Sequence, residues 1–275
     1  MENIRQAVER AKAGQSSTKA QVFDNLGLPQ WNTDPGAETR GAVGPEHSGS
    51  ELDCKHLMSR RIVSHNGADQ RSRPYDMLRT QVLQTMALKG WRILGITSPT
   101  SGCGKTTTAI NLAFSIARHP DQSVLLIDTD LQKAQIADCL GLNPVGGGVL
   151  DILQDRATLR GATIPIRAGS QRIVVLPTAA TKESSELMAS RAMRNLLQDI
   201  KKSREPHIVI VDLPPLLSSD DAISLLPHID CVLLVAAVGL SKASEVEECT
   251  KHLHSSHLVR LVVNKATEPN SHYYY

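Results

Sequence analysis

The sequence is poor in aromatic side chains, which make up 3% of its 275 residues. A core with so few rings must be built from aliphatic side chains. Even so, three of the four tyrosines are the last three residues, Tyr273, Tyr274 and Tyr275. Burial is least expected at a chain terminus, so packing does not account for this cluster. Two interpretations stay open at this point: a chance cluster or tag remnant on the surface, or three hydroxyl groups that serve as a substrate.

The net charge is also small, and the sequence lacks cysteine pairs and long apolar runs. A formal net charge of +2 gives no basis for predicting a nucleic-acid partner or a charged membrane surface. The five cysteines include no CxxC pair, which fits reduced thiols in a cytoplasm better than a disulfide scaffold. No apolar run approaches the roughly 18 residues that span a bilayer, and the first residues lack the apolar segment of a signal peptide. We therefore expect a cytoplasmic protein without a direct membrane span, whose contact with a membrane goes through a partner.

The composition divides the chain into three parts. Residues 1–46 are expected to hold a short helix, over residues 2–12, and a flexible linker rich in Gly, Ser, Thr, Pro and Gln. Residues 47–268 carry the regular patterns of a folded domain. Residues 269–275 are expected to form a tail that ends in the tyrosine cluster.

Short apolar runs alternate with helical patterns across the domain, and this alternation predicts its fold. The runs are apolar on both faces, which is typical of strands covered by helices on both sides. The sequence therefore predicts an α/β domain with a mostly parallel sheet sandwiched by helices. Residues 143–171 are its least regular part. The expected strands are 91–97, 123–128, 172–177, 207–212, 231–237 and 258–264, and the expected helices are 73–90, 105–118, 184–203 and 242–254.

The stretch "ILGITSPTSGCGKTTTAINLA" carries the clearest functional pattern. A predicted strand ends at Thr97, and Gly104 with Lys105 and Thr106 opens a predicted helix, which is the context of a phosphate-binding P-loop. The glycines let backbone N–H groups face phosphate oxygens; Lys105 supplies a cation for the β- and γ-phosphates, and Thr106 a hydroxyl ligand for Mg²⁺. Pro99 replaces the first glycine of the usual motif, and an ordinary glycine turn is the alternative. The predicted nucleotide contacts of the loop are Ser101, Gly102, Cys103, Gly104, Lys105, Thr106 and Thr107.

Aspartates follow two of the predicted strands. Asp128 and Asp130 come at the end of "VLLIDTD", and Asp212 ends "IVIVD". Ligands of open α/β sheets lie outside the carboxyl ends of the strands, so all three carboxylates are expected to converge on the P-loop. Mg²⁺ takes oxygen ligands and keeps several waters, and we predict Thr106, Asp130 and Asp212 as its ligands. The alternative for each aspartate alone is a turn or capping role.

Five segments together resemble a known family. They are "SPTSGCGKTT", "VLLIDTDLQKA", "VIVDLPPLLSSDDA", "LVVNK" and the terminal tyrosines. They look like the bacterial tyrosine kinases of capsule and exopolysaccharide synthesis, which belong to the deviant P-loop class of ATPases. The resemblance implies a P-loop NTPase fold that binds Mg²⁺ and ATP. It also implies a homo-oligomer in which a neighbouring subunit phosphorylates the tyrosine cluster. A membrane-embedded chain-length regulator activates these kinases, so the chain is expected at the inner face of the plasma membrane.

The resemblance assigns roles residue by residue. It implies that Lys105, Asp128 and Asp212 are catalytic, and that Asn264 and Lys265 lie near the adenine. For Asp128 two roles stay open, the base for the incoming tyrosine hydroxyl and a further metal ligand. The implied phosphate acceptors are Tyr273, Tyr274 and Tyr275.

Two departures from the family pattern leave other functions open. Gln132 stands where the family usually has arginine, and Arg73 and Asp76 stand where its oligomerisation helix has Glu and Arg, with Arg79 retained. The exchange of the first two charges predicts a subunit contact with swapped roles, and a local pair of Asp76 with Arg79 is the alternative. The competing functions are a positioning ATPase that passes phosphate to water, and a nucleotide-binding regulatory subunit with little turnover.

Overall fold

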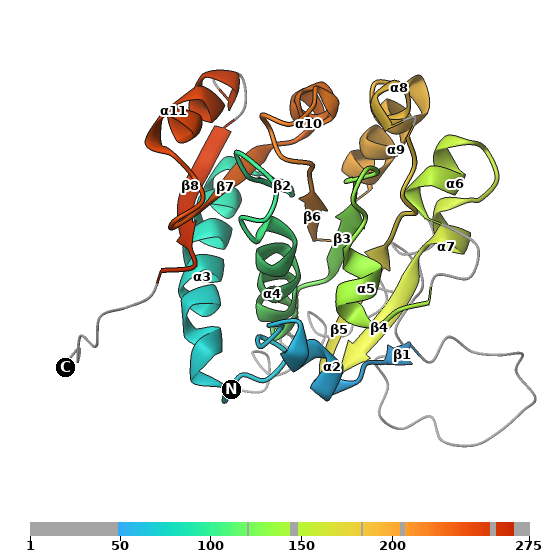
Figure 1. Ribbon diagram of the computed structural model, residues 1–275. Helices are drawn as coiled ribbons and strands as arrows, with labels where there is room; N and C mark the ends of the chain where they lie inside the picture. Colours follow the sequence, from blue (N-terminus) through green and yellow to red (C-terminus); the bar gives the residue numbers. More distant parts are fainter. Residues whose placement is uncertain are drawn as a thin grey trace, which may run out of the picture.

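The computed structural model describes residues 49–266 apart from residues 120, 144–147, 183, 204–206 and 254–256 (Figure 1). The helix predicted over residues 2–12 and the tyrosines at 273–275 lie outside the described residues. Among the helices in the described ranges, none combines the length and the apolar composition that a membrane crossing requires.

A single eight-stranded sheet runs through the described part of the chain, in the order β1-β4-β5-β3-β6-β2-β7-β8. Neighbouring strands are parallel except for β4 and β5, which pair antiparallel. This arrangement confirms the predicted α/β fold with a mostly parallel sheet. The strands are β1 (Ser50–Glu51), β2 (Ile93–Thr97), β3 (Val124–Asp128), β4 (Ile164–Ala168), β5 (Gln171–Leu176), β6 (Ile208–Asp212), β7 (Cys231–Ala237) and β8 (His257–Asn264).

Helices cover both faces of this sheet, as the doubly apolar strands require. Side chains alternate along each central strand, so Ile93 packs with the cluster under α6–α11 while Leu94 packs with the cluster under α2–α5. The helices are α2 (Cys54–Ser59), α3 (Arg73–Lys89), α4 (Lys105–Ala117), α5 (Ile136–Leu140), α6 (Val149–Leu153), α7 (Leu159–Ala162), α8 (Ser184–Met188), α9 (Arg191–Lys202), α10 (Asp221–Leu225) and α11 (Ala243–His252), with the 3₁₀ turns η2 (Gln70–Ser72) and η3 (Leu226–His228).

Two elements differ from the sequence prediction. The helix expected over 184–203 is broken into α8 and α9, because Ser190 caps the second helix with a side chain that accepts from the backbone N–H of Met193 at 3.2 Å. The irregular stretch 143–171 contains strand β4, which includes Pro165 and pairs antiparallel with β5. Only tertiary pairing makes so short a segment a strand.

Helix α3 packs beside α4 (Figure 1), and Asp76 of α3 contacts residues of α4 and its C-terminal end. The Ser115 hydroxyl of α4 donates to Oδ1 of Asp76 at 2.6 Å, and Arg118 pairs with the same oxygen. Arg79 lies 3.6 Å from it and also donates to the backbone carbonyl of Ser115. The local pair of Asp76 with Arg79 is therefore one part of a network within the chain, which gives Asp76 a structural role that the family pattern did not suggest.

Replacing Asp76 with arginine is expected to destabilise the protein by on the order of 2 kcal/mol, because it sets three guanidinium groups together and removes the acceptor of the Ser115 hydroxyl. Urea unfolding of the variant measures this loss. The control is Met77→Arg, which places the same charge one residue along on a side chain that is 65% exposed. Equal unfolding midpoints for the two variants would rule out the network as a source of stability.

Candidate active site

The predicted P-loop joins β2 to α4 and is held in shape by two glycines and one asparagine. Gly102 and Gly104 have φ angles of 84° and 94°, which residues other than glycine rarely adopt. A Cβ at Gly104 would also lie 2.2 Å from Nδ2 of Asn264. That amide donates to the carbonyl of Cys103 at 2.9 Å, so the end of edge strand β8 fastens the loop.

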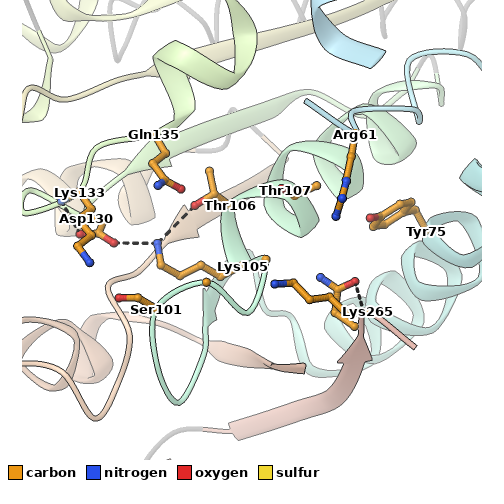
Figure 2. A pocket seen from close by; sticks show the side chains of 13 residues that line it. Arg61, Tyr75, Ser101, Lys105, Thr106, Thr107, Asp130, Lys133, Gln135 and Lys265 are labelled. Atoms are coloured by element: carbon orange, nitrogen blue, oxygen red, sulfur yellow. Dashed lines mark hydrogen bonds and ion pairs between the residues drawn. The ribbon is translucent and has the colours of Figure 1, made fainter. Parts of the chain in front are cut away.

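A pocket of about 310 Å³ opens above the loop. Figure 2 shows its lining side chains, with Lys105, Thr106, Asp130 and Lys133 toward one end and Arg61, Tyr75 and Lys265 toward the other. Four of the thirteen lining residues are cationic and one is acidic, a balance that suits a polyanion. The lining is Arg61, Tyr75, Ser101, Gly102, Gly104, Lys105, Thr106, Thr107, Asp130, Lys133, Gln135, Asn264 and Lys265.

Lys105 and Thr106 meet two of the predicted carboxylates at the phosphate end. Nζ of Lys105 lies 2.9 Å from Oδ2 of Asp130 and 3.5 Å from Oδ1 of Asp212. The Thr106 hydroxyl donates to Oδ2 of Asp212 at 2.6 Å. Burial lowers the pKa of Lys105, but the charges of Asp212 and Asp130 outweigh it and raise that pKa overall. Lys105 is therefore a buried side chain that stays cationic.

Asp128 lies beside Asp212, because β3 and β6 pair these two residues directly. Burial first, and then the charge of Asp212, raises the pKa of Asp128 to about 7. Its Oδ1 accepts from the N–H of Asp130 at 3.1 Å, and its Oδ2 from those of Gln135 and Ile136 at 3.1 and 3.0 Å. Asp128 thus holds the segment that carries Asp130 and starts α5, and Asp130 rather than Asp128 lines the pocket.

The chemistry of this cluster fits Mg²⁺. Three buried carboxylates face one lysine, which leaves an excess of negative charge, and burial raises the pKa of Asp212 as well. No group of three or more His, Cys, Asp and Glu side chains in the described ranges is arranged to hold a metal ion by itself. Mg²⁺ keeps waters and takes one or two carboxylates together with substrate phosphates, and Asp130 and Asp212 beside the Thr106 hydroxyl offer such donors.

Two predicted or notable positions lie away from the pocket. The thiol of Cys103 is buried, with Sγ 3.3 Å from the hydroxyl of Ser241. Gln132 donates from Nε2 to Oδ2 of the buried Asp221 at 3.0 Å, and Ser185 donates to the other oxygen at 2.6 Å. Gln132 therefore satisfies a buried carboxylate, where an arginine would form an ion pair.

Sequence reasoning missed four of the lining residues: Arg61, Tyr75, Lys133 and Gln135. Lys133 and Gln135 follow the aspartates of β3 closely, so their place next to the metal site could have been inferred. Arg61 and Tyr75 precede the P-loop in the sequence, and no motif marks them. The predicted acceptors Tyr273, Tyr274 and Tyr275 lie outside the described residues.

Comparison with known sequences finds an AAA domain model and tyrosine-protein kinases among the relatives. A family model described as an AAA domain matches residues 91–254. The putative tyrosine-protein kinase EpsB of Ralstonia solanacearum is 27% identical over 97% of this chain. The match covers 34% of that protein, so the chain spans about a third of the length of this relative.

Solved structures show the same likeness. The kinase domain of the Escherichia coli tyrosine kinase ETK is 25% identical, with a TM-score of 0.66 over 90% of this chain and 93% of that domain. The septum site-determining protein MinD of Pyrococcus horikoshii, solved with Mg-ADP, is 23% identical, with a TM-score of 0.52 over 62% of this chain and 69% of its own. The second match shows the fold alone, and the two together confirm the predicted P-loop NTPase fold. The EpsB and ETK matches also confirm the resemblance to the bacterial tyrosine kinases.

Proposed function

We propose that this chain, which belongs to the AAA domain family and to the bacterial tyrosine kinases within it, transfers the γ-phosphate of ATP to tyrosine hydroxyls. The observation that carries the proposal is the meeting of Lys105 and Thr106 with Asp130 and Asp212 beneath a pocket rich in cations. Phosphoryl transfer depends chiefly on positioning and charge neutralisation, and these residues can provide both.

Each residue has a proposed task in that reaction. Thr106, Asp130 and Asp212 would hold Mg²⁺, which supplies positive charge to the phosphate oxygens. Lys105 exchanges its contact with Asp130 for the β- and γ-phosphates, and the backbone N–H groups of the loop hold the remaining oxygens. Asp128 shapes the loop from Asp130 to Ile136; to act as base or as metal ligand it must turn one oxygen away from those backbone donors.

The proposed acceptors are Tyr273, Tyr274 and Tyr275, phosphorylated by a neighbouring subunit. Strand β8 ends at Asn264, on the rim of the pocket. Eight residues separate Asn264 from Tyr273, which with that tyrosine reach about 30 Å when fully extended. So short a segment has little slack for doubling back into its own site, and reach grows toward Tyr274 and Tyr275. We therefore propose transfer between the subunits of a homo-oligomer.

The wider setting of this activity is also a proposal. The resemblance favours a kinase that regulates exopolysaccharide or capsule synthesis or export, and that works at the inner face of the plasma membrane. Its activator would be a membrane-embedded chain-length regulator. Residues 1–46, 47–268 and 269–275 would serve as linker, kinase domain and acceptor tail, respectively.

Phosphate mapping tests this function. The purified protein is incubated with Mg-ATP, with and without the cytoplasmic segment of the candidate membrane partner, and its phosphorylated residues are located by mass spectrometry. We expect phosphotyrosine at 274 and 275 ahead of 273, and none when all three are phenylalanine. Release of inorganic phosphate without any phosphotyrosine would instead identify a positioning ATPase.

A further inference from the structure

The end of the pocket away from the metal site is lined by residues that take no part in the proposed transfer of phosphate. Figure 2 shows Arg61, Tyr75 and Lys265 gathered there, with Thr107 between this end and Lys105. Phosphates bound by the P-loop would occupy the Lys105 end, so the remainder of a nucleotide has to extend toward Arg61 and Tyr75. Lys265 alone among these three was expected there from the sequence.

Arg61 is held in an unusual backbone conformation by a buried asparagine. Its φ of 62° lies in the left-handed region, which is uncommon for residues other than glycine. Asn111 of α4 fixes this turn, because its Oδ1 accepts from the N–H groups of Val63 and Ser64 at 2.8 and 2.9 Å while its Nδ2 donates to the carbonyl of Arg61 at 3.0 Å. Conformations of this kind persist where the surrounding structure enforces them.

The same asparagine connects the two ends of the pocket. Its Nδ2 also donates to the carbonyl of Thr107 at 2.9 Å, in the first turn of the helix that follows the P-loop. Arg61 is therefore fastened to the element that holds the phosphates. The turn therefore fixes the backbone from which the Arg61 side chain reaches the pocket.

Tyr75 brings a flat aromatic ring to the same end, from the first turn of α3. Its side chain is half-buried, and burial raises the pKa of its hydroxyl, so the ring stays neutral. Within the described ranges, neither the Tyr75 hydroxyl nor the Arg61 guanidinium has a hydrogen-bond or ion-pair partner in the chain. Both planar groups are thus available to a ligand in the pocket.

We propose that Arg61 and Tyr75 form the base-binding end of this pocket and hold the adenine ring of ATP against a guanidinium plane and a phenol ring. The inference rests on the proposed use of ATP. Aromatic and guanidinium planes stack on nucleobases, whereas the phosphate end offers only backbone, hydroxyl and point charges. The amide of Asn264 donates to the carbonyl of Cys103 and accepts from the N–H of Lys265. Asn264 therefore fastens the P-loop rather than binding the base.

Calorimetric binding of ATP and of inorganic tripolyphosphate separates the two ends of the pocket. Tyr75→Ala and Arg61→Gly are each expected to weaken ATP binding about tenfold, the loss of one stacking contact, and to leave tripolyphosphate binding unchanged. Glycine is chosen at 61 because it adopts the left-handed turn without strain. Tyr75→Phe keeps the ring and should bind ATP like the wild type. The control is Arg60→Ala, which removes a neighbouring arginine that pairs with Asp138 at the surface.

The outcomes distinguish this inference from the proposed function. If Tyr75→Ala and Arg61→Gly bind ATP as the wild type does, the base lies elsewhere and the inference is wrong, while the kinase proposal stands. Equal losses for ATP and tripolyphosphate would also overturn it, because the side chains would then act on the phosphates or on the fold. A wild-type protein that binds tripolyphosphate and not ATP would overturn the inference and the proposed function together.

Discussion

Replacing Lys105 with methionine is expected to reduce ATP-dependent tyrosine phosphorylation by at least about 100-fold, the loss that follows removal of one preorganised charge-stabilising contact. Lys105 is the cation that lies against Asp130 and Asp212 at the bottom of the pocket. Methionine fills a similar volume but supplies no charge for the phosphates. Phosphotyrosine is measured after incubation with Mg-ATP, with circular dichroism as the check that the fold is kept.

A matched control for this variant is Lys133→Met, which removes another cation that lines the pocket but has no ion pair with the carboxylates in the described part of the chain. Its loss of activity should be clearly smaller. Unchanged phosphotyrosine in a folded Lys105→Met protein would contradict the assignment of the P-loop.

Replacing Asp212 with asparagine is expected to abolish the same activity while stabilising the nucleotide-free protein at neutral pH. Burial raises the pKa of Asp212, so its ionised carboxylate destabilises the folded state in the absence of ligand. Asparagine keeps the shape and can still bond to the Thr106 hydroxyl, but it gives up a metal ligand. A site that is strained without its ligand and active with it commonly shows this trade of stability for function.

The gain in stability expected for Asp212→Asn depends on pH because of the neighbouring Asp128. Burial and the charge of Asp212 raise the pKa of Asp128 from 3.8 to about 7. Between these values the folded state keeps a proton that the unfolded state has released, so this contribution to stability is present below about 3.8 and is lost as the pH rises to about 7. Removing the charge of Asp212 lowers the pKa of Asp128 and reduces that loss.

Urea unfolding in EDTA at pH 5 and pH 8 measures the effect. The stability of Asp212→Asn relative to the wild type should be greater at pH 8 than at pH 5. A variant that is less stable than the wild type at pH 8 would show that the contacts of Asp212 with Lys105 and Thr106 outweigh the cost of its burial.

Local signals were sufficient to predict the central strands and the P-loop. Strands such as β3 and β6 are apolar on both faces and end in an aspartate. Their composition therefore predicted buried strands, and their last residues predicted the site. Parallel pairing then brings Asp128 next to Asp212, as expected for residues at the carboxyl ends of strands. The break between α8 and α9 depends on the side chain of Ser190, and strand β4 on pairing with β5, which explains why both were missed.

Arg61 and Tyr75 at the far end of the pocket could not be predicted, because packing between distant segments places them there. Arg61 enters the pocket through the contacts of Asn111, and Tyr75 through the packing of α3 beside α4. Asn111, which interrupts the apolar run "AINLAF" in α4, is the one signal that the sequence offered. The network around Asp76 could not be predicted for a similar reason, because its partners Ser115 and Arg118 belong to a different segment of the chain.

Mixing two variants tests the central claim, transfer of phosphate from the P-loop site to the tyrosine tail of another subunit. One chain is Lys105→Met with Tyr273, Tyr274 and Tyr275 intact, and the other is active with all three changed to phenylalanine. After incubation with Mg-ATP, phosphotyrosine should appear on the Lys105→Met chain at a rate that rises with protein concentration. If neither chain is labelled while the wild type labels itself at a rate independent of dilution, transfer occurs within one subunit and the account is wrong.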